Sequence, residues 1–215
     1  MSDERSTALI GLTGQTGAGK STVSGIFVQN GFVLLDADRI AHEIMEPGRP
    51  CVEELFDYFG EGIRCPDGSL DRRALAAIVF SDKRKLESLN SISHPYITEE
   101  IFRRISRLTQ EGQRLVLLDA PTLFESKASD FCDLIISVIA EPERRLTRIM
   151  QRDALTREQA LARMNAQLDE AFFIRHSDFV IRNNADLETL AALSGEVADK
   201  IRLHYHAQTA QPAVS

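Results

Sequence analysis

The amino-acid sequence predicts an α/β protein in which helices cover both faces of a parallel five-stranded sheet. Five short apolar segments are each followed by a helical pattern, as in folds where helices connect parallel strands. These segments are residues 8–12, 31–35, 114–119, 133–139 and 178–182. A phosphate-binding loop directly follows the first segment. About 80 residues separate the second segment from the third, which is too long for an ordinary crossover connection.

Composition narrows the class of protein. The chain has 215 residues, of which 43% are hydrophobic, so it can bury a sizeable core. Its net charge of -7 argues against bulk nucleic-acid binding, although a few arginines and loop amides can still bind anions. The longest apolar runs, 115–118 and 134–140, fall far short of the roughly 20 residues of a membrane span. We therefore expect a cytoplasmic protein with no nucleic-acid or membrane partner.

The three cysteines, Cys51, Cys65 and Cys132, show no C-x-x-C spacing. An odd number of cysteines without metal-binding or redox spacing indicates reduced and mostly buried thiols rather than a disulfide framework. We expect no structural metal.

The strongest motif is a complete phosphate loop, Gly-Gln-Thr-Gly-Ala-Gly-Lys-Ser, over residues 14–21. Its glycines allow positive φ angles and leave no Cβ in the way, so successive N–H groups can face phosphate oxygens. The following helix adds its positive N-terminal end, while Lys20 can reach the β- and γ-phosphates and Ser21 can ligate Mg²⁺. The motif predicts a nucleoside triphosphate bound by Gly14, Gly17, Ala18, Gly19, Lys20, Ser21 and Thr22.

Carboxylates follow two of the predicted strands. Asp36 and Asp38 come after the second strand, at the sheet edge where ligands bind in α/β folds. One of them can accept a proton from a substrate hydroxyl, and the other can support Mg²⁺ or cap the next helix. Alternatively, both are only helix caps. Asp119 ends the third strand, an arrangement that brings a carboxylate near the metal in phosphate-loop enzymes.

The long segment between the second and third strands, about 37–112, reads as a helical insertion that binds substrate. Turn residues punctuate it, and we expect one helix to start at Ser69 or Leu70. Pro95 suits the first turn of a long helix that reaches Glu111 and stops at Gly112.

A second helical segment, about 141–176, resembles a lid. Arg144, Arg145, Arg148 and Arg152 recur on or near one of its helices. Most such charges lie on solvated faces, but phosphoryl transfer gains from cations that a mobile segment brings to the developing negative charge. We expect Arg148 and Arg152 to serve in this way.

Several short sequences then occur in one order along the chain. They are Gly11-Leu12-Thr13-Gly14, the phosphate loop, Asp36-Ala37-Asp38, Phe59-Gly60, Asp67-Gly68-Ser69-Leu70-Asp71-Arg72, His94-Pro95, Pro121 with Phe124-Glu125, Arg152-Asp153 and Asn183-Asn184. From Ala8 to about Ile201 this set resembles the dephospho-CoA kinase family. The resemblance implies ATP-dependent phosphorylation of the ribose 3′-hydroxyl of dephospho-CoA, the closing step of coenzyme A synthesis. It also implies a three-layer phosphate-loop kinase core with CoA-binding and lid regions.

The resemblance implies a role for each matching residue. Asp38 is then the base that faces the 3′-hydroxyl, with Asp36 as the supporting carboxylate. Lys20 and Arg148 neutralise the transferred phosphoryl group. The nucleotide is further bound by Arg148, Arg152 and Asn183. The acceptor is bound by Asp36, Asp38, Arg72, His94, Pro121, Phe124 and Glu125. From spacing alone, His94 could equally be a cap or a core histidine.

We expect a single domain over 1–215. Its core comprises 8–36, 113–140 and 177–203, the insertion about 37–112, the lid about 141–176, and a frayed tail 204–215. Two positions depart from the family pattern, Gln15 where Gly is usual and Thr122 where Leu is usual. The side chain at position 15 is expected to point away from the phosphates, whereas Thr122 lies beside the predicted substrate wall.

Other functions fit part of this pattern. A kinase for another small acceptor, such as a nucleoside monophosphate or shikimate, would need the same core and lid. A nucleotide-binding switch without an acceptor is a second alternative, although no Asn-Lys-x-Asp motif indicates GTP. Nothing in the sequence indicates an oligomeric state.

Overall fold

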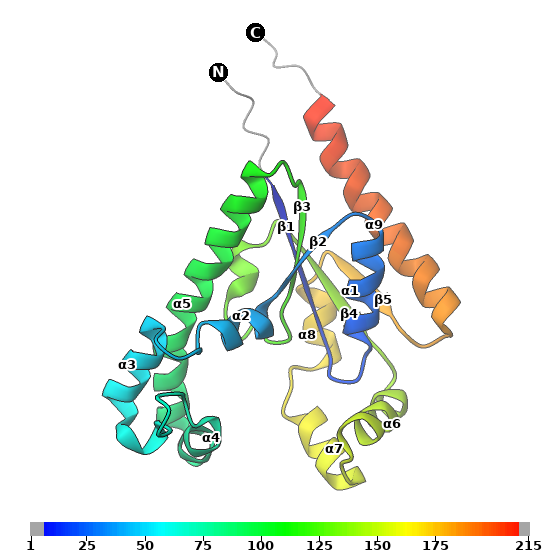
Figure 1. Cartoon of the computed structure of the whole chain (residues 1–215). Helices are drawn as coiled ribbons and strands as arrows, with labels where there is room; N and C mark the ends of the chain where they lie inside the picture. The colour runs from blue at the N-terminus through cyan, green and yellow to red at the C-terminus, as the bar shows by residue number, and fades with distance from the viewer. Residues whose placement is uncertain (1–6, 211–215) are drawn as a thin grey trace. The chain divides into compact units, whose positions relative to one another are not determined.

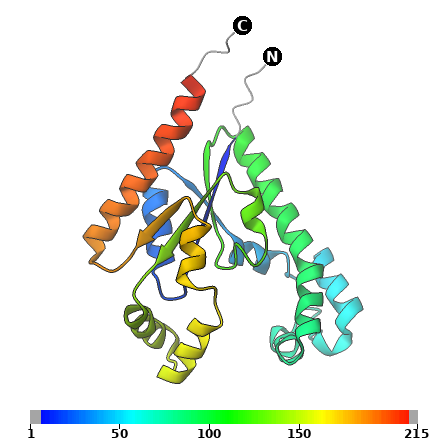
Figure 2. The same cartoon turned by 180° about the vertical axis from the view of Figure 1, so that it is seen from behind.

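The computed structural model describes residues 7–210, with side chains through residue 205. The chain divides into two compact units (Figures 1 and 2). One unit combines Met1–Leu35 with Leu108–Ser215 and contains the sheet, and the other is Asp36–Arg107 and is helical. The second unit starts one residue before the range predicted for the helical insertion, about 37–112, and ends five residues before its end.

The sheet has five strands in the order β2-β3-β1-β4-β5. Their bounds are β1 Ala8–Gly14, β2 Val33–Asp36, β3 Leu115–Asp119, β4 Leu134–Ile139 and β5 Phe179–Arg182. The pairings of β1 with β3, of β1 with β4, and of β4 with β5 are all parallel. The predicted α/β class and all five predicted strands are confirmed. Because Leu12 of β1 lies opposite Asp119 of β3, the phosphate loop and Asp119 share one sheet edge.

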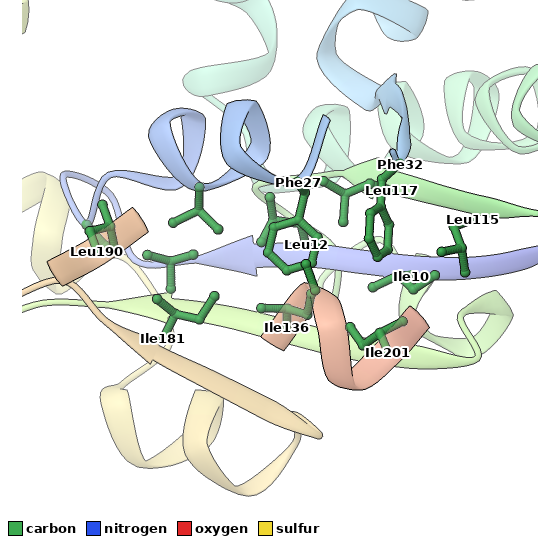
Figure 3. Close-up of a cluster of buried hydrophobic side chains, with 14 of the residues drawn as sticks. Ile10, Leu12, Phe27, Phe32, Leu115, Leu117, Ile136, Ile181, Leu190 and Ile201 are labelled. Atoms are coloured by element: carbon green, nitrogen blue, oxygen red, sulfur yellow. The ribbon is translucent and has the colours of Figure 1, made fainter. Parts of the chain in front are cut away.

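Two helices, α1 (Lys20–Gln29) and α9 (Leu187–Ala210), cover one face of the sheet (Figure 3). Alternate strand residues such as Ile10, Leu12 and Ile136 point to this face and pack against Phe27 of α1 and Ile201 of α9. This is the period-2 pattern of a strand meeting the apolar stripes of helices. The main apolar core therefore lies directly beneath the helix that follows the phosphate loop.

The residues between β3 and β4 pack against the opposite face. A Cβ at Gly11 of β1 would lie 2.8 Å from Leu123 Cδ2 and 2.9 Å from Cys132 Sγ, so a larger residue at this position would have to displace these two side chains. A short 3₁₀ helix, Ala128–Phe131, contacts β1, and α8 (Glu170–Arg175) contacts β4. The sheet thus forms the middle of three layers, as predicted.

All three cysteines are free, as expected. Burial raises the pKa of Cys51 to about 11 and that of Cys132 to about 12, so both thiols stay protonated at neutral pH.

The helical unit contains α2 (Ala37–Glu43), α3 (Pro50–Phe59), a 3₁₀ turn (Glu61–Ile63), α4 (Arg72–Phe80) and most of α5 (Lys83–Gln110). We expected α4 to start at Ser69 or Leu70. It starts at Arg72 instead, because the Asp71 carboxylate accepts hydrogen bonds from the N–H groups of Arg73 (3.0 Å) and Ala74 (2.9 Å) and thereby caps the helix.

The expected start of the long helix near Pro95 was wrong, whereas its end was correct to within one residue. Pro95 lies inside α5, which begins twelve residues earlier at Lys83. Asp82 caps this start, since its carboxylate accepts a hydrogen bond from the N–H of Arg84 (2.9 Å). The helix tolerates an internal proline because Ile92 and Ile101, on either side of it, are buried.

The segment 141–176 forms three helices, α6 (Pro142–Asp153), α7 (Arg157–Asn165) and α8. Leu146 and Ile149 of α6 pack with Ala160 of α7 in a small core of their own. A capping box at Thr156 and Gln159 fixes the start of α7. The predicted helical character of this segment is therefore confirmed, but its role as a lid stays a prediction.

The frayed tail predicted for 204–215 was wrong for its first part. Helix α9 continues to Ala210, and Ile201 and Tyr205 still pack against the main core. No glycine or proline interrupts residues 196–210, so apolar contacts and helix propensity sustain the helix. Residues 211–215 lie outside the described residues.

Candidate active site

The phosphate loop joins β1 to α1 through a tight turn. The N–H of Gln15 donates to the carbonyl of Val138 (3.1 Å), and the N–H of Ala18 donates to the carbonyl of Gln15 (3.0 Å). Gly17 has a φ of 76°, and a Cβ there would lie 2.7 Å from the carbonyl oxygen of Arg145. Gly19, with a φ of 94°, is the N-cap of α1. Glycine is therefore needed at 17 and 19 both for conformation and for space.

Lys20 and Asp119 form an ion pair at the edge of the sheet. Their side chains are 17% and 11% exposed, so the pair is largely shielded from solvent. Ser21 follows Lys20 in the first turn of α1, and its side chain is exposed. The loop thus has an ammonium group paired with a carboxylate, and a hydroxyl-bearing residue next in the chain, which are the group types suited to phosphate and a divalent cation.

Side chains from beyond β4 donate hydrogen bonds to the carbonyls of the loop. Arg148 Nη1 lies 3.3 Å from the carbonyl of Gly17 and 3.4 Å from that of Ala18. Asn183 Nδ2 donates to the carbonyl of Ala18 at 2.7 Å and is buried. The structure therefore brings two of the predicted nucleotide-binding residues, Arg148 and Asn183, to the loop.

Two further residues contact the loop that we did not select from the sequence. Arg145 Nε donates to the carbonyl of Thr16 (2.9 Å), and Gln167 Oε1 accepts a hydrogen bond from the N–H of Thr16 (2.7 Å). Burial lowers the pKa of Arg145, with the nearby Glu170 carboxylate opposing this effect. Helical periodicity could have identified Arg145, because it lies four residues before Ile149 and next to Leu146, on the buried side of α6. No sequence signal singles out Gln167.

Arg152 is not brought to the loop in the same way. It pairs with the neighbouring Asp153 (2.8 Å), which also accepts a hydrogen bond from Arg163 (2.7 Å), and more than half of its side chain is exposed. Its predicted contact with the nucleotide stays a prediction.

In the helical unit, Asp36 at the end of β2 and Asp38 in α2 differ in environment. The Asp36 carboxylate accepts a hydrogen bond from the N–H of Arg39 (3.0 Å) and is the N-cap of α2. Asp38 lies in the first turn of α2, is exposed, and does not cap the helix. The alternative that both acids are only caps therefore fits Asp36 but not Asp38.

Arg72 and His94, both predicted to bind the acceptor, also lie in the helical unit. Arg72 Nη2 lies 3.4 Å from the carbonyl of His42 at the end of α2, in a weak hydrogen bond. His94 is partly buried in α5, and this burial lowers its pKa. It is not the helix cap that its spacing allowed, because α5 starts at Lys83.

The remaining predicted acceptor residues follow β3. The carbonyl of Pro121 accepts a hydrogen bond from Thr13 Oγ1 (3.2 Å), next to the loop. The rings of Phe124 and Phe172 form a T-shaped pair whose centroids are 5.1 Å apart, while Glu125 is exposed. Thr122, one departure from the family pattern, has an exposed side chain. At the other departure, Gln15 is buried, and its Oε1 has no hydrogen-bond partner among the described residues.

A sequence model of the dephospho-CoA kinase family matches residues 8–189. The chain belongs to the dephospho-CoA kinase family. The dephospho-CoA kinase of Listeria monocytogenes is 45% identical over 83% of this chain and 90% of its own length. That of Carboxydothermus hydrogenoformans is 42% identical over 84% of this chain and 88% of its own length.

Solved structures agree with membership of the dephospho-CoA kinase family. A protein from Thermus thermophilus has a TM-score of 0.77 and 36% identity, covering 90% of this chain and 98% of its own. The dephospho-CoA kinase of Campylobacter jejuni has a TM-score of 0.68 and 29% identity, covering 90% of this chain and 96% of its own. A shikimate kinase from Acinetobacter baumannii shares only the fold, at 16% identity and a TM-score of 0.51.

No described helix combines the length and apolar character of a membrane span. The described residues also contain no group of three or more His, Cys, Asp or Glu side chains that could hold a metal ion. The second finding is compatible with magnesium, because Mg²⁺ beside nucleotide phosphates usually has only one or two protein ligands and keeps several waters.

Proposed function

We propose that this protein transfers the γ-phosphoryl group of ATP to the ribose 3′-hydroxyl of dephospho-CoA, giving coenzyme A. The observation that carries the proposal is family membership over most of the chain, joined to a complete phosphate loop with Lys20, Asp119 and Arg148 around it. ATP use follows from the kinase family. The specific acceptor and the roles of single residues belong to the proposal.

In this reaction the loop N–H groups and Lys20 bind the phosphates of ATP, and the guanidinium of Arg148 neutralises charge on the transferred phosphoryl group. Asp38 accepts the proton of the attacking 3′-hydroxyl. The γ-phosphoryl passes in line to this oxygen without a covalent enzyme intermediate, so catalysis consists mainly of positioning and charge neutralisation. Segment 141–176 acts as a lid, and the unit Asp36–Arg107 binds the acceptor.

Magnesium fits the donor set at the loop. The Ser21 hydroxyl and the Asp119 carboxylate would hold it, since hydroxyl and carboxylate oxygens are the ligands that Mg²⁺ prefers. When bound, the ion neutralises charge on the β- and γ-phosphates. A location in the cytoplasm remains a prediction from the sequence.

The test is ATP turnover with and without dephospho-CoA, using shikimate and a nucleoside monophosphate as matched acceptors. We expect turnover to depend on dephospho-CoA and the product to carry its new phosphate at the ribose 3′ position, as shown by phosphorus NMR. Preference for another acceptor would refute the assigned substrate, and ATP hydrolysis unaffected by any acceptor would favour a nucleotide-dependent switch.

A further inference from the structure

The peptide groups on both sides of Thr16, at the outer part of the phosphate loop, are held by side chains distant in sequence. The Thr16 N–H donates to Gln167 Oε1 at 2.7 Å, and the Thr16 carbonyl accepts from Arg145 Nε at 2.9 Å. Arg145 lies in α6, and Gln167 lies between α7 and α8. Both therefore come from segment 141–176, and Arg145 is only 5% exposed.

The orientation of these peptides decides where the loop N–H groups point. In a trans peptide the carbonyl and the following N–H point in opposite directions. Because the carbonyls of Thr16 and Ala18 face Arg145 and Asn183, the N–H groups of Gly17 and Gly19 are directed away from those side chains. N–H groups aligned in this way form the concave anion-binding surface of a phosphate loop.

The backbone of α6 also packs against this part of the loop. A Cβ at Gly17 would lie 2.7 Å from the carbonyl oxygen of Arg145 and 3.0 Å from Ile149 Cγ1. The loop and α6 are thus in direct contact as well as hydrogen-bonded, which limits how far the Thr16 peptides can rotate while Arg145 and Gln167 remain in place.

We propose that Gln167 and Arg145 are positioning residues for the nucleotide. They fix the peptide groups on both sides of Thr16 so that the loop N–H groups face the phosphates. As a result, the affinity for ATP depends on the placement of segment 141–176. The inference rests on ATP binding by the loop, which is part of the proposed function, and does not depend on the identity of the acceptor.

The first test compares Gln167→Leu with Gln151→Leu. Leucine has no acceptor for the Thr16 N–H, and Gln151 is an exposed residue of α6 that provides the same substitution in the same segment. We expect Gln167→Leu to raise the Kd of ATP and of ADP about tenfold, the effect of losing one hydrogen bond to a shielded backbone group. The KM of dephospho-CoA should stay within twofold of the Gln151→Leu value.

The second test concerns Arg145, with the exposed neighbour Arg144 as control. Arg145→Met should weaken ATP binding, and Arg145→Lys should restore much of it because an ammonium group can still donate to the Thr16 carbonyl. Arg144→Met should leave ATP affinity unchanged. A role in folding alone would lower the melting temperature of the nucleotide-free protein without this selective loss and rescue.

Hydrogen exchange gives a readout independent of activity. We expect the Thr16 amide, followed by ¹⁵N NMR, to exchange slowly in the wild type and in Gln151→Leu but faster in Gln167→Leu. The inference would be overturned if both Gln167→Leu and Arg145→Met bound ATP with a Kd within twofold of their control variants. It would also be overturned if the Thr16 amide exchanged at an unchanged rate in Gln167→Leu. Failure of the proposed function looks different, since wild-type protein would then bind ATP without dephospho-CoA-dependent turnover.

Discussion

Lys20 contributes the ammonium group of the phosphate loop, within a turn whose shape depends on glycine backbone. We expect Lys20→Ala to lower kcat by about 10³-fold or more, because the charge on the β- and γ-phosphates is then no longer neutralised. Lys200→Ala, at an exposed position of α9, is the control. Steady-state kinetics together with circular dichroism checks this, and near-normal turnover by folded Lys20→Ala would contradict the assignment.

Asp38 is exposed in the first turn of α2 and free of a capping role, which leaves its carboxylate available to a substrate. Asp38→Asn keeps the shape but cannot take a proton. We expect kcat to fall by about 10² to 10⁴ while the Kd of ATP changes little, the usual range for a positioned general base. Equal and mild effects of Asp38→Asn and Asp36→Asn would remove Asp38 from the catalytic residues.

Asp36 should behave differently, because its carboxylate caps α2. Asparagine caps helices about as well as aspartate, so Asp36→Asn should leave stability nearly unchanged, whereas Asp36→Ala should cost about 1 kcal/mol. If Asp36 also supports Mg²⁺, raised Mg²⁺ should partly rescue the turnover of Asp36→Asn but not that of Asp38→Asn. Urea unfolding and a Mg²⁺ series in the kinetic assay measure the two effects.

Which site residues could be predicted from sequence depends on how local their contacts are. The loop was predictable because eight consecutive residues determine its backbone. Arg148 can be predicted because an arginine in a helical segment near a bound triphosphate favours phosphoryl transfer. Arg145 and Gln167 reach Thr16 across 129 and 151 positions of sequence, and only the folded arrangement of α6 and α7 reveals which side chains face the loop.

The helices show the same distinction at their ends. Apolar periodicity predicts which segments are strands and which are helical. It does not predict the full lengths of α5 and α9, which are longer than expected. In α5, burial of apolar residues continues the helix through Pro95, and in α9 apolar contacts together with helix propensity extend it beyond residue 203. Tertiary packing of this kind leaves little trace in a local window of sequence.

Charged side chains link helix α2 to helix α5. Glu43 of α2 pairs with Arg104 of α5, and Arg104 also pairs with Glu100 at 2.7 Å. Arg103 pairs with Glu100 at 2.6 Å but not with Glu43, and its side chain is mostly exposed. Loss of the interhelical link in Arg104→Met should lower the free energy of unfolding by about 1 to 2 kcal/mol, whereas Arg103→Met should cost less than about 0.5 kcal/mol. Urea titration of both variants gives the comparison, and equal losses would contradict it.

Helix α9 contains a buried hydroxyl whose Oγ has no hydrogen-bond partner among the described residues, that of Ser194. Ser194→Ala removes this unsatisfied group and improves helix propensity, so we expect the protein to gain about 0.5 to 1 kcal/mol. The buried Ser24 of α1 differs, because its hydroxyl donates to the carbonyl of Ser21 (3.0 Å), and Ser24→Ala should bring no gain. Destabilisation by Ser194→Ala would show that its hydroxyl is bonded.

Stability of the whole molecule should depend on pH through His94. Burial lowers its pKa below the usual 6.5. Between that value and the folded-state pKa, the unfolded chain binds a proton that the folded chain does not, so unfolding becomes easier as the pH falls. We expect the free energy of unfolding to drop less steeply between pH 7.5 and pH 5.5 in His94→Gln than in the wild type. The exposed His42→Gln is the control, and identical slopes in all three proteins would contradict the assignment.

At the scale of the molecule, the fold class was predictable but the strand order was not. Each strand is visible in the sequence through its own apolar residues. The order β2-β3-β1-β4-β5 depends instead on pairings between distant residues, and both pairings of β1 join residues more than a hundred positions apart. The division into two compact units follows the same logic, since a long helical insertion is visible in sequence only as an unusually long gap between strands.

The central position of β1 has a consequence for biosynthesis. The ribosome makes β1 and the phosphate loop well before both neighbours of β1, because those neighbours are strands that begin at Leu115 and Leu134. The unit Asp36–Arg107, which lies between β1 and these strands in sequence, is helical and rich in local contacts, so it can fold before β1 is paired. The nascent phosphate loop is therefore attached to a strand without partners until the residues of β3 have left the exit tunnel.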